Sequence, residues 1–177
     1  MSNAEYHSKK EYESSTSIRD IKLNPKKYLF RKTHETVPTK AMEEGTAVHT
    51  YFLENDLFKK NYVFKPKAFN GRTKEGKEWM QEHGHLNILS AEWEENLIQM
   101  NHNFLNSPAK FIYDKEGLAE LSYFWEDLYK IKGKCRPDWL SKDGNTVVDL
   151  KTTQDASPKG FQKSIANFGY HIQCAWY

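Results

Sequence analysis

The sequence predicts an α/β fold, in which a mixed central sheet with an antiparallel meander is flanked by helices. In the first two thirds of the chain, apolar residues recur at the spacing of helical turns. From Leu118 to Trp125 the period changes to two, the spacing expected of a strand. Ser157 and Pro158 then supply the start signals of another helix. The order of helices, strands and helices favours strands that are covered by helices.

Length and charge set the first limits on organisation and function. The chain has 177 residues, enough for a domain with its own core. We expect a single domain over 1–177, mainly helical in 1–115, with the sheet and its following helices in 116–177. The net charge of +2 neither demands nor excludes a nucleic-acid partner, so any basic surface must be local.

Cysteine content and hydropathy exclude several classes. Cys135 and Cys174 are the only cysteines, too few for an iron–sulfur cluster or a cysteine-rich zinc site. A disulfide between them stays open, although a reducing cytoplasm is the simpler interpretation. The chain has no run of about 18 apolar residues and no apolar segment near its start. We therefore expect neither a membrane span nor a secretion signal.

The elements before the strand region follow from apolar spacing, caps and prolines. Residues 1–16 are polar. The expected elements are a loop over 14–17 that leads into a helix N-cap, two short helices on either side of Pro25, a loop over 33–39, a helix over 40–54, a strand over 61–65, and helices over 76–83, 91–105 and 108–112. Later in the chain, helices are expected over 158–168 and from about His171, separated by Gly169.

Two features of the helical part have both a structural and a functional interpretation. His49 lies in the middle of the predicted helix over 40–54, where a histidine is more often a packed core residue than a metal ligand. The segment between residues 65 and 77 is basic and is either a solvated loop or a phosphate contact. Its basic residues are Lys65, Lys67, Arg72, Lys74 and Lys77.

A hairpin around Asp143-Gly144 is the centre of the prediction, because this dipeptide between apolar-rich runs is a strong turn signal. With a two-residue turn, Lys142 pairs with Asn145, and Asp138 comes to lie opposite Asp149. Opposed residues have Cβ atoms roughly 4.5–5.5 Å apart, and two carboxylates there repel each other. The preceding strand over 118–125 is expected to contain Glu120.

The hairpin register therefore predicts a cluster of two carboxylates and a lysine. Lys151 lies two residues after Asp149, and the period of a strand puts both side chains on one face. Hard divalent metals prefer carboxylate oxygens, and metal-assisted phosphoester cleavage needs several of them together. A nearby lysine can orient water or offset charge on a phosphate. The alternative is a solvated hairpin with surface charges.

These residues resemble the signature of PD-(D/E)xK nucleases, and in particular RecB-like nucleases and the exonuclease domain of the RecE (exonuclease VIII) type. The resemblance covers most of the chain and depends on four short motifs in the right order. The motifs are Pro137-Asp138, the triplet Asp149-Leu150-Lys151, the run from Gly45 to His49, and Gln173 with Tyr177 as a QxxxY pair.

The resemblance implies a restriction-endonuclease-like core and a role for each matching residue. His49, Asp138, Asp149 and the Leu150 carbonyl would be metal ligands for Mg²⁺, with Mn²⁺ as the alternative. Lys151 would position or activate water, while Gln173 and Tyr177 would orient the lysine, a bound water or the DNA. Glu120 stands where relatives often have an acidic residue behind the ligands. Arg136 and the five basic residues between 65 and 77 are the expected DNA contacts.

The activity implied by the resemblance is a metal-dependent 5′-to-3′ exonuclease on double-stranded DNA ends, which makes single strands for annealing recombination. The alternatives are an endonuclease of the same superfamily, or an inactive DNA- or partner-binding module. A phage or prophage origin in a bacterial cytoplasm, a RecT-like single-strand annealing partner and a homo-oligomer are further expectations. RecE-type domains continue beyond their QxxxY motif, so we also expect further strand and helix after Tyr177.

Overall fold

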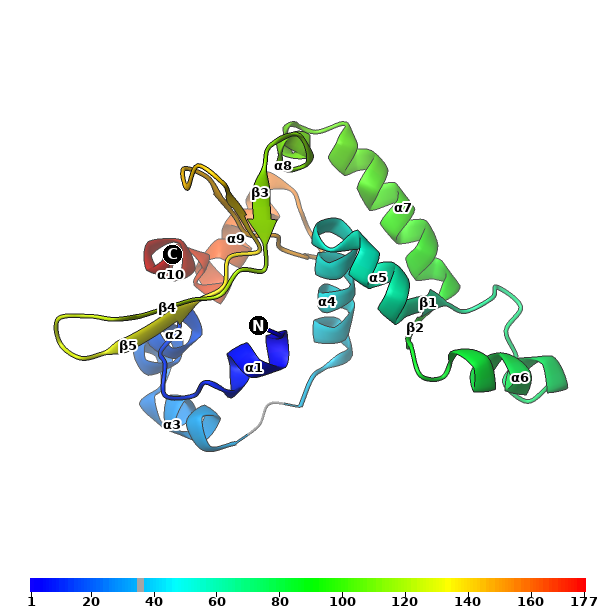
Figure 1. Ribbon diagram of the computed structural model, residues 1–177, viewed down its shortest axis with the longest axis horizontal. Helices are drawn as coiled ribbons and strands as arrows, with labels where there is room; N and C mark the ends of the chain where they lie inside the picture. The colour runs from blue at the N-terminus through cyan, green and yellow to red at the C-terminus, as the bar shows by residue number, and fades with distance from the viewer. Residues whose placement is uncertain (35–36) are drawn as a thin grey trace. The chain divides into compact units, whose positions relative to one another are not determined.

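The computed structural model describes residues 1–34 and 37–177 (Figure 1). The chain divides into two compact units, one formed by Met1–Thr39 with Gly117–Tyr177 and the other by Lys40–Glu116. We refer to them as unit 1 and unit 2. The loop predicted over 33–39 lies partly outside the described residues. None of the described helices has the length and apolar character needed to cross a membrane.

Unit 2 is mainly helical and contains a two-stranded parallel sheet, in which Tyr62 pairs with Asn87. Its elements are α4 (Lys40–Leu53), α5 (Asn55–Asn61), β1 (Tyr62–Phe64), α6 (Lys74–His83), β2 (Asn87–Leu89), α7 (Ala91–Leu105), the 3₁₀ helix η1 (Pro108–Lys110) and α8 (Phe111–Asp114). Its core contains Ala47, Val48, Phe52, Phe58, Leu97 and Ile112. The predicted helices 40–54 and 91–105 are confirmed, whereas α5 and β2 were not predicted.

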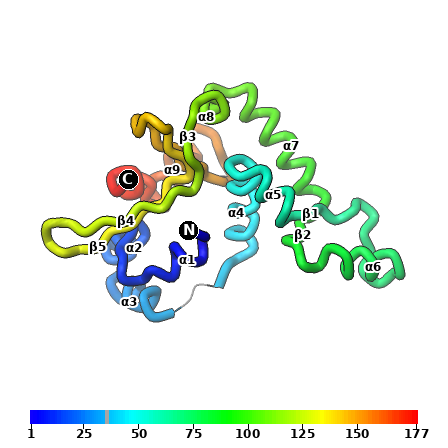
Figure 2. The backbone as a smooth tube through the Cα atoms, viewed as in Figure 1, coloured from blue at the N-terminus to red at the C-terminus, as the bar shows by residue number. Residues whose placement is uncertain are grey.

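Unit 1 contains the hairpin region, with helices from both ends of the chain (Figure 2). Its elements are α1 (Asn3–Ser8), α2 (Ser15–Leu23), α3 (Pro25–Thr33), β3 (Gly117–Ala119), β4 (Tyr123–Glu126), β5 (Lys132–Cys135), β6 (Trp139–Ser141), β7 (Val147–Val148), α9 (Pro158–Phe168) and α10 (Tyr170–Trp176). The two helices predicted around Pro25 are confirmed. Ser14 is the N-cap of α2, so the loop predicted over 14–17 already belongs in part to the helix. Ser2 and Glu5 form a capping box that starts α1, which the sequence did not predict.

The strand predicted over 118–125 is interrupted, so Glu120 lies between two strands and not inside one. β3 pairs with β6, while β4 pairs with β5 in a separate sheet. Glu120 has φ +54°, a left-handed conformation that ends the extended run. The alignment of the two segments is nevertheless the same on both sides of the break, with Gly117 paired to Ser141 before it and Tyr123 paired to Cys135 after it. The described sheets are therefore small and separate, and the single mixed central sheet with a continuous meander is not found.

The predicted hairpin register is confirmed, although its turn is longer than expected. Trp139 pairs with Val148 and Leu140 with Val147, the pairs that the sequence predicts. The pairing ends where the Ser141 amide donates to the Thr146 carbonyl over 2.9 Å, leaving four residues in the loop. Gly144 adopts φ +73° there, which glycine does at little cost. The predicted two-residue turn is therefore wrong, while the alignment of the strands is right.

The N-terminal segment is tied to β5 by a buried lysine. The ammonium of Lys134 donates to the carbonyls of Tyr6 and Lys9, over 2.8 and 2.7 Å, and lies 4.7 Å from the centre of the Tyr6 ring. Burial lowers the pKa of the Lys134 ammonium. Glu13 adds backbone hydrogen bonds to Lys132 and Lys134. These contacts hold residues 1–13 against the strand that leads to Asp138.

Candidate active site

Asp138 lies directly before β6 and is buried, with 8 % of the residue exposed. The observed pairing of β6 with β7 ends at Trp139 and Val148, so Asp138 directly precedes the paired region and Asp149 directly follows it. An Asp138 carboxylate oxygen accepts a hydrogen bond from the Leu150 amide at 2.5 Å. This hydrogen bond fixes the Asp138 carboxylate next to the segment that carries Asp149, as the sequence predicts.

Glu120 lies on the other side of Asp138. The Glu120 amide donates to the Asp138 carbonyl over 3.1 Å, at the break between β3 and β4. A carboxylate oxygen of each residue lies within 4.8 Å of the other. The interruption of the predicted strand thus brings a second acidic side chain to Asp138. The left-handed conformation of Glu120 is not compatible with a regular strand, so it marks the point at which the strand is interrupted.

The Arg136 guanidinium donates to three groups of unit 1 and also lies 5.9 Å from the centre of the Tyr6 ring. Its Nε lies 2.6 Å from a Glu120 carboxylate oxygen, and another of its nitrogens donates to the Ser122 hydroxyl at 3.1 Å and the Met1 carbonyl at 3.2 Å. Only 11 % of the Arg136 side chain is exposed. The ion pair of Arg136 is therefore with Glu120. Its expected contact with DNA stays a prediction.

Lys151 and Asp149 form an ion pair in the segment that follows β7. Both side chains are largely shielded, with 21 % and 20 % exposed. The two side chains meet as the sequence predicts, although β7 ends at Val148 and neither residue belongs to a strand. Lys151 can act on a group bound beside Asp149, because its ammonium is already at that carboxylate.

Helix α10 brings Gln173 to the same carboxylate, and Tyr177, the residue after the helix, contacts Gln173. The Gln173 side-chain amide donates to an Asp149 carboxylate oxygen and to the Tyr177 hydroxyl, in both cases over 2.7 Å. The Tyr177 hydroxyl donates to the Arg136 carbonyl at 3.2 Å. Burial, together with the nearby carboxylates of Asp149 and Asp138, raises the pKa of Tyr177. Tyr177 therefore stays protonated and available as a donor at neutral pH.

Sequence reasoning missed one aromatic residue at this site. The ring of Tyr170, the first residue of α10, lies 4.9 Å from the Lys151 ammonium. Tyr170, Gln173 and Tyr177 are spaced i, i+3 and i+7, which puts them on one face of a helix. That spacing was the available signal, since it places Tyr170 beside the two residues of the QxxxY pair.

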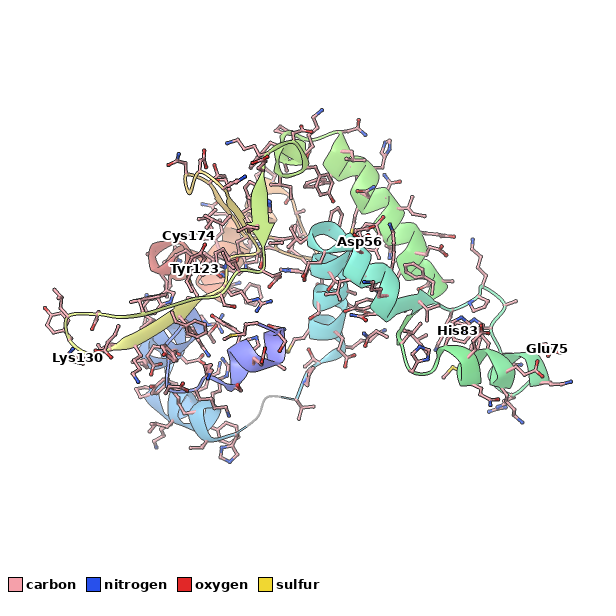
Figure 3. The ribbon with its side chains drawn as sticks, in the orientation of Figure 1. Asp56, Glu75, His83, Tyr123, Lys130 and Cys174 are labelled. Carbon is pink, nitrogen blue, oxygen red and sulfur yellow. The ribbon has the colours of Figure 1, made fainter. Side chains whose placement is uncertain are left out.

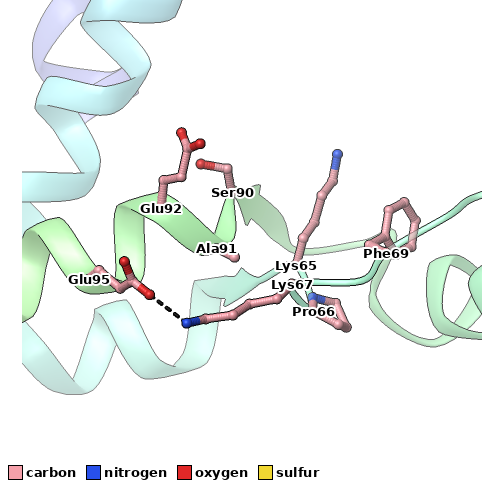
Figure 4. A pocket seen from close by; sticks show the side chains of 8 residues that line it. All are labelled: Lys65, Pro66, Lys67, Phe69, Ser90, Ala91, Glu92 and Glu95. Atoms are coloured by element: carbon pink, nitrogen blue, oxygen red, sulfur yellow. Dashed lines mark hydrogen bonds and ion pairs between the residues drawn. The ribbon is translucent and has the colours of Figure 1, made fainter.

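The remaining predicted residues belong to unit 2. His49 lies on α4 and is half-buried, so its part in a metal site stays a prediction. Lys65 and Lys67 line an open groove of about 500 Å³ together with Phe69, Ser90, Glu92 and Glu95 (Figure 4). Lys67 reaches Glu95 at 2.6 Å across this groove. The groove is therefore not uniformly basic.

The other basic residues of the predicted loop are divided between loop and helix. Lys74 and Lys77 lie on α6, which begins two residues earlier than the expected helix, because Thr73 caps it. Lys74 is 3.9 Å from Glu78, one turn along α6. The Arg72 amide donates to the Asn70 side chain. Their expected contact with DNA stays a prediction.

The donor set of unit 1 fits a hard divalent metal ion. Asp138 and Glu120 present carboxylate oxygens within 4.8 Å of each other, and Asp138 accepts from the amide of Leu150, the residue after Asp149. Carboxylate oxygens are the ligands that Mg²⁺ and Mn²⁺ prefer. Both cysteines are free, so they do not form a disulfide with each other. Cys135 is buried. The chemistry of the site is that of oxygen donors and one lysine.

The mixed α/β fold and this cluster are compatible with a domain of the PD-(D/E)xK superfamily. Residues 14–177 match the family described as a PDDEXK-like domain of unknown function (DUF3799), and the chain belongs to this family. Membership indicates a nuclease-type function and, with it, a divalent metal. No curated protein matches the chain. Residues 1–13, which include α1, precede the matched region.

Proposed function

We propose that this protein is a metal-dependent exodeoxyribonuclease that degrades double-stranded DNA from its ends in the 5′-to-3′ direction. The observation that carries the hydrolytic part is the joint engagement of Asp149 by Lys151 and Gln173, next to Leu150, whose amide donates to the buried Asp138. These residues combine acidic metal ligands, a cation and an oriented amide in one place. The family supports nuclease chemistry, and the resemblance to RecE-type domains supports the exonuclease part.

The residues of unit 1 that would hold the metal are Asp138, Asp149 and the Leu150 carbonyl, and the resemblance implies His49 as a further ligand. Glu120 is a further carboxylate beside Asp138. When bound, a divalent metal at such a site lowers the pKa of water and stabilises charge on a scissile phosphate. Within the chain itself, the Leu150 amide orients Asp138 and Gln173 orients Asp149. Both carboxylates are thus held before any ligand arrives, which reduces the ordering needed on binding.

Lys151 is the cation of the site. Its ammonium can orient the attacking water or offset the charge that builds on the phosphate, since it already lies at Asp149. Gln173 and Tyr177 link this carboxylate to the backbone of Arg136, two residues before Asp138. Asp149, with its ion-pair partner Lys151, is therefore connected by hydrogen bonds to the backbone two residues before Asp138.

Digestion of linear and closed circular duplex DNA tests the proposal. We expect Mg²⁺-dependent release of mononucleotides from linear duplex and no cleavage of the circle, because an exonuclease needs an end. Duplexes labelled at the 5′ or the 3′ end decide the direction. Cleavage of the closed circle would instead identify the alternative, an endonuclease of the same superfamily. No hydrolysis of either substrate would contradict a nuclease and leave a DNA- or partner-binding module.

Two further expectations belong to the same proposal. The single strand left by 5′-to-3′ digestion is a substrate for annealing recombination, so a single-strand annealing protein of RecT type is the proposed partner. A homo-oligomer is the second expectation, and it follows from the resemblance alone. Copurification with such a partner, and light scattering of the chain with and without DNA, would test both.

A further inference from the structure

We propose that Tyr170 is a positioning residue for Lys151, whose ammonium it holds against the face of its ring. The proposal deepens the proposed nuclease function and rests on it, because it assigns a new residue to the water- or phosphate-directed lysine. The Lys151 ammonium lies 4.9 Å from the Tyr170 ring centre, inside the distance of about 6 Å at which a ring face attracts a cation.

Lys151 has two contacts, and they differ in kind. One is the ion pair with Asp149, and the other is the Tyr170 ring. Asp149 is also an expected metal ligand, and a carboxylate that ligates a cation attracts a second cation less. The ring takes no part in ligation, so its attraction for the ammonium is the same with and without metal. Tyr170 therefore keeps Lys151 in place in the state in which the lysine would act.

The Tyr170 ring is itself held in place by two aromatic neighbours. It stacks with Phe168 at 5.8 Å, with an interplanar angle of 25°, and lies 6.1 Å from Phe161. Both neighbours belong to α9, so the ring is fixed by the junction between α9 and α10. A ring whose orientation is set in advance can restrict a flexible lysine at less entropic cost.

The junction before Tyr170 is also fixed. Gly169 adopts φ +68°, a left-handed conformation that ends α9 and starts α10 at once. The Arg19 guanidinium donates to the Phe168 carbonyl at 3.0 Å. Helix α10 therefore starts at a defined angle and presents Tyr170 to Lys151 and Gln173 to Asp149. Helix α10 thus orients both members of the Asp149–Lys151 pair.

A spectroscopic experiment tests the contact without DNA or metal. The lysines of the chain are reductively methylated with ¹³C, and the Lys151 signal is assigned from its absence in Lys151→Arg. Above a ring face, we expect this signal to be shifted upfield in the wild type and in Tyr170→Phe. In Tyr170→Leu, which keeps an apolar side chain without a ring, the upfield shift should be lost. A Lys151 signal without an upfield shift in the wild type would overturn the proposal.

A kinetic experiment tests the role. We expect Tyr170→Leu to reduce the rate at saturating linear duplex by about fivefold with KM unchanged within about twofold, while Tyr170→Phe stays within about twofold of wild type. A general loss of structure would not be rescued by phenylalanine, and thermal unfolding of both variants checks this directly. If Tyr170→Phe is as slow as Tyr170→Leu, or if only KM changes, the positioning role is wrong.

The two experiments separate this proposal from the proposed function. A wild-type chain that hydrolyses no DNA would contradict the nuclease proposal and, with it, the kinetic role of Tyr170. The methyl signal would still decide whether the ring holds the lysine. Suppose instead that the wild type shows the shifted signal but Tyr170→Leu digests DNA at the normal rate. That result would contradict the positioning role and leave the nuclease proposal intact.

Discussion

Arg136 donates from Nε to a Glu120 carboxylate oxygen at 2.6 Å, and Glu120 in turn lies within 4.8 Å of an Asp138 carboxylate oxygen. The ion pair is largely shielded, with 11 % of Arg136 and 19 % of Glu120 exposed. It spans the interruption between β3 and β4, where the chain leaves regular pairing. Arg136 therefore offsets the charge of an acidic side chain that stands beside the expected metal ligand.

We expect Arg136→Gln to destabilise the protein by about 2 kcal/mol, because it leaves the Glu120 carboxylate shielded without its cation. Urea unfolding of the wild type, both single variants and the double variant with Glu120→Gln gives the coupling energy between the two side chains. As a control, Lys67→Gln breaks the exposed pair with Glu95 and should leave stability unchanged. A coupling energy near zero would show that Arg136 does not stabilise Glu120.

Asp149→Asn should abolish binding of Mg²⁺ or Mn²⁺ measured by calorimetry. Asparagine keeps an oxygen for the Gln173 amide but removes the charge that a divalent cation needs. Asp114→Asn, the same change at an exposed position at the end of α8, is the matched control and should bind metal normally. Unchanged affinity in Asp149→Asn would exclude Asp149 as a ligand.

Lys151→Ala should leave DNA and metal binding nearly intact and reduce turnover by about 10²–10³, the usual cost of one electrostatic contact made in the transition state. The measurement is single-turnover digestion of linear duplex at saturating Mg²⁺. Lys22→Ala, at an exposed position on α2, controls for the loss of one positive charge. If Lys151 only offsets carboxylate charge, its removal should change the rate less than about threefold, under roughly 1 kcal/mol.

Changing Lys65 and Lys77 to glutamine together should flatten the dependence of log K for DNA on log salt by about two units. Each phosphate contact that is lost releases about one counterion fewer on binding. Lys65 and Lys77 are chosen because Lys67 and Lys74 already lie near the carboxylates of Glu95 and Glu78, which offset their charge. The matched control changes the exposed Lys59 and Lys60 of α5. Equal salt slopes for all three proteins would mean that the segment is solvated surface.

Tyr6→Phe should reduce the loss of stability at alkaline pH. Burial, aided by the nearby Cys135, raises the pKa of Tyr6 to about 12, compared with about 10 in an unfolded chain. The stabilising contribution of the protonated phenol is complete below pH 10 and is lost as the pH rises through 12. Between these values, the free energy of unfolding should fall by about 2 kcal/mol less in Tyr6→Phe than in the wild type.

Urea unfolding at a series of pH values measures this difference. Tyr129→Phe removes a hydroxyl at the exposed tip of the β4–β5 hairpin, next to Lys130 (Figure 3), and serves as the control. Identical alkaline profiles for the wild type and Tyr6→Phe would show that Tyr6 is not buried in solution. That result would also question the attachment of residues 1–13 to β5 through Lys134.

The sequence by itself determined the hairpin register and most of the helices. Asp143-Gly144 supplies a turn, and the flanking residues alternate, so the strands can align in only one way that keeps Trp139 inside. The alignment of Asp138 with Asp149, and of Asp149 with Lys151, follows from this local information. Helix starts such as Ser157-Pro158 were likewise readable, because caps act within one turn.

Only the tertiary structure decided which groups surround these carboxylates. Glu120 fits an alternating strand pattern in the sequence, yet its backbone adopts φ +54° and its side chain pairs with Arg136. No local propensity predicts this conformation or this ion pair. The contact of Tyr170 with Lys151 depends on the angle between α9 and α10, which packing of distant segments sets. Short-range periodicity fixes which side chains share a face of one element. Contacts between elements come from the burial and pairing of residues far apart in the chain, which a pattern within one segment does not contain.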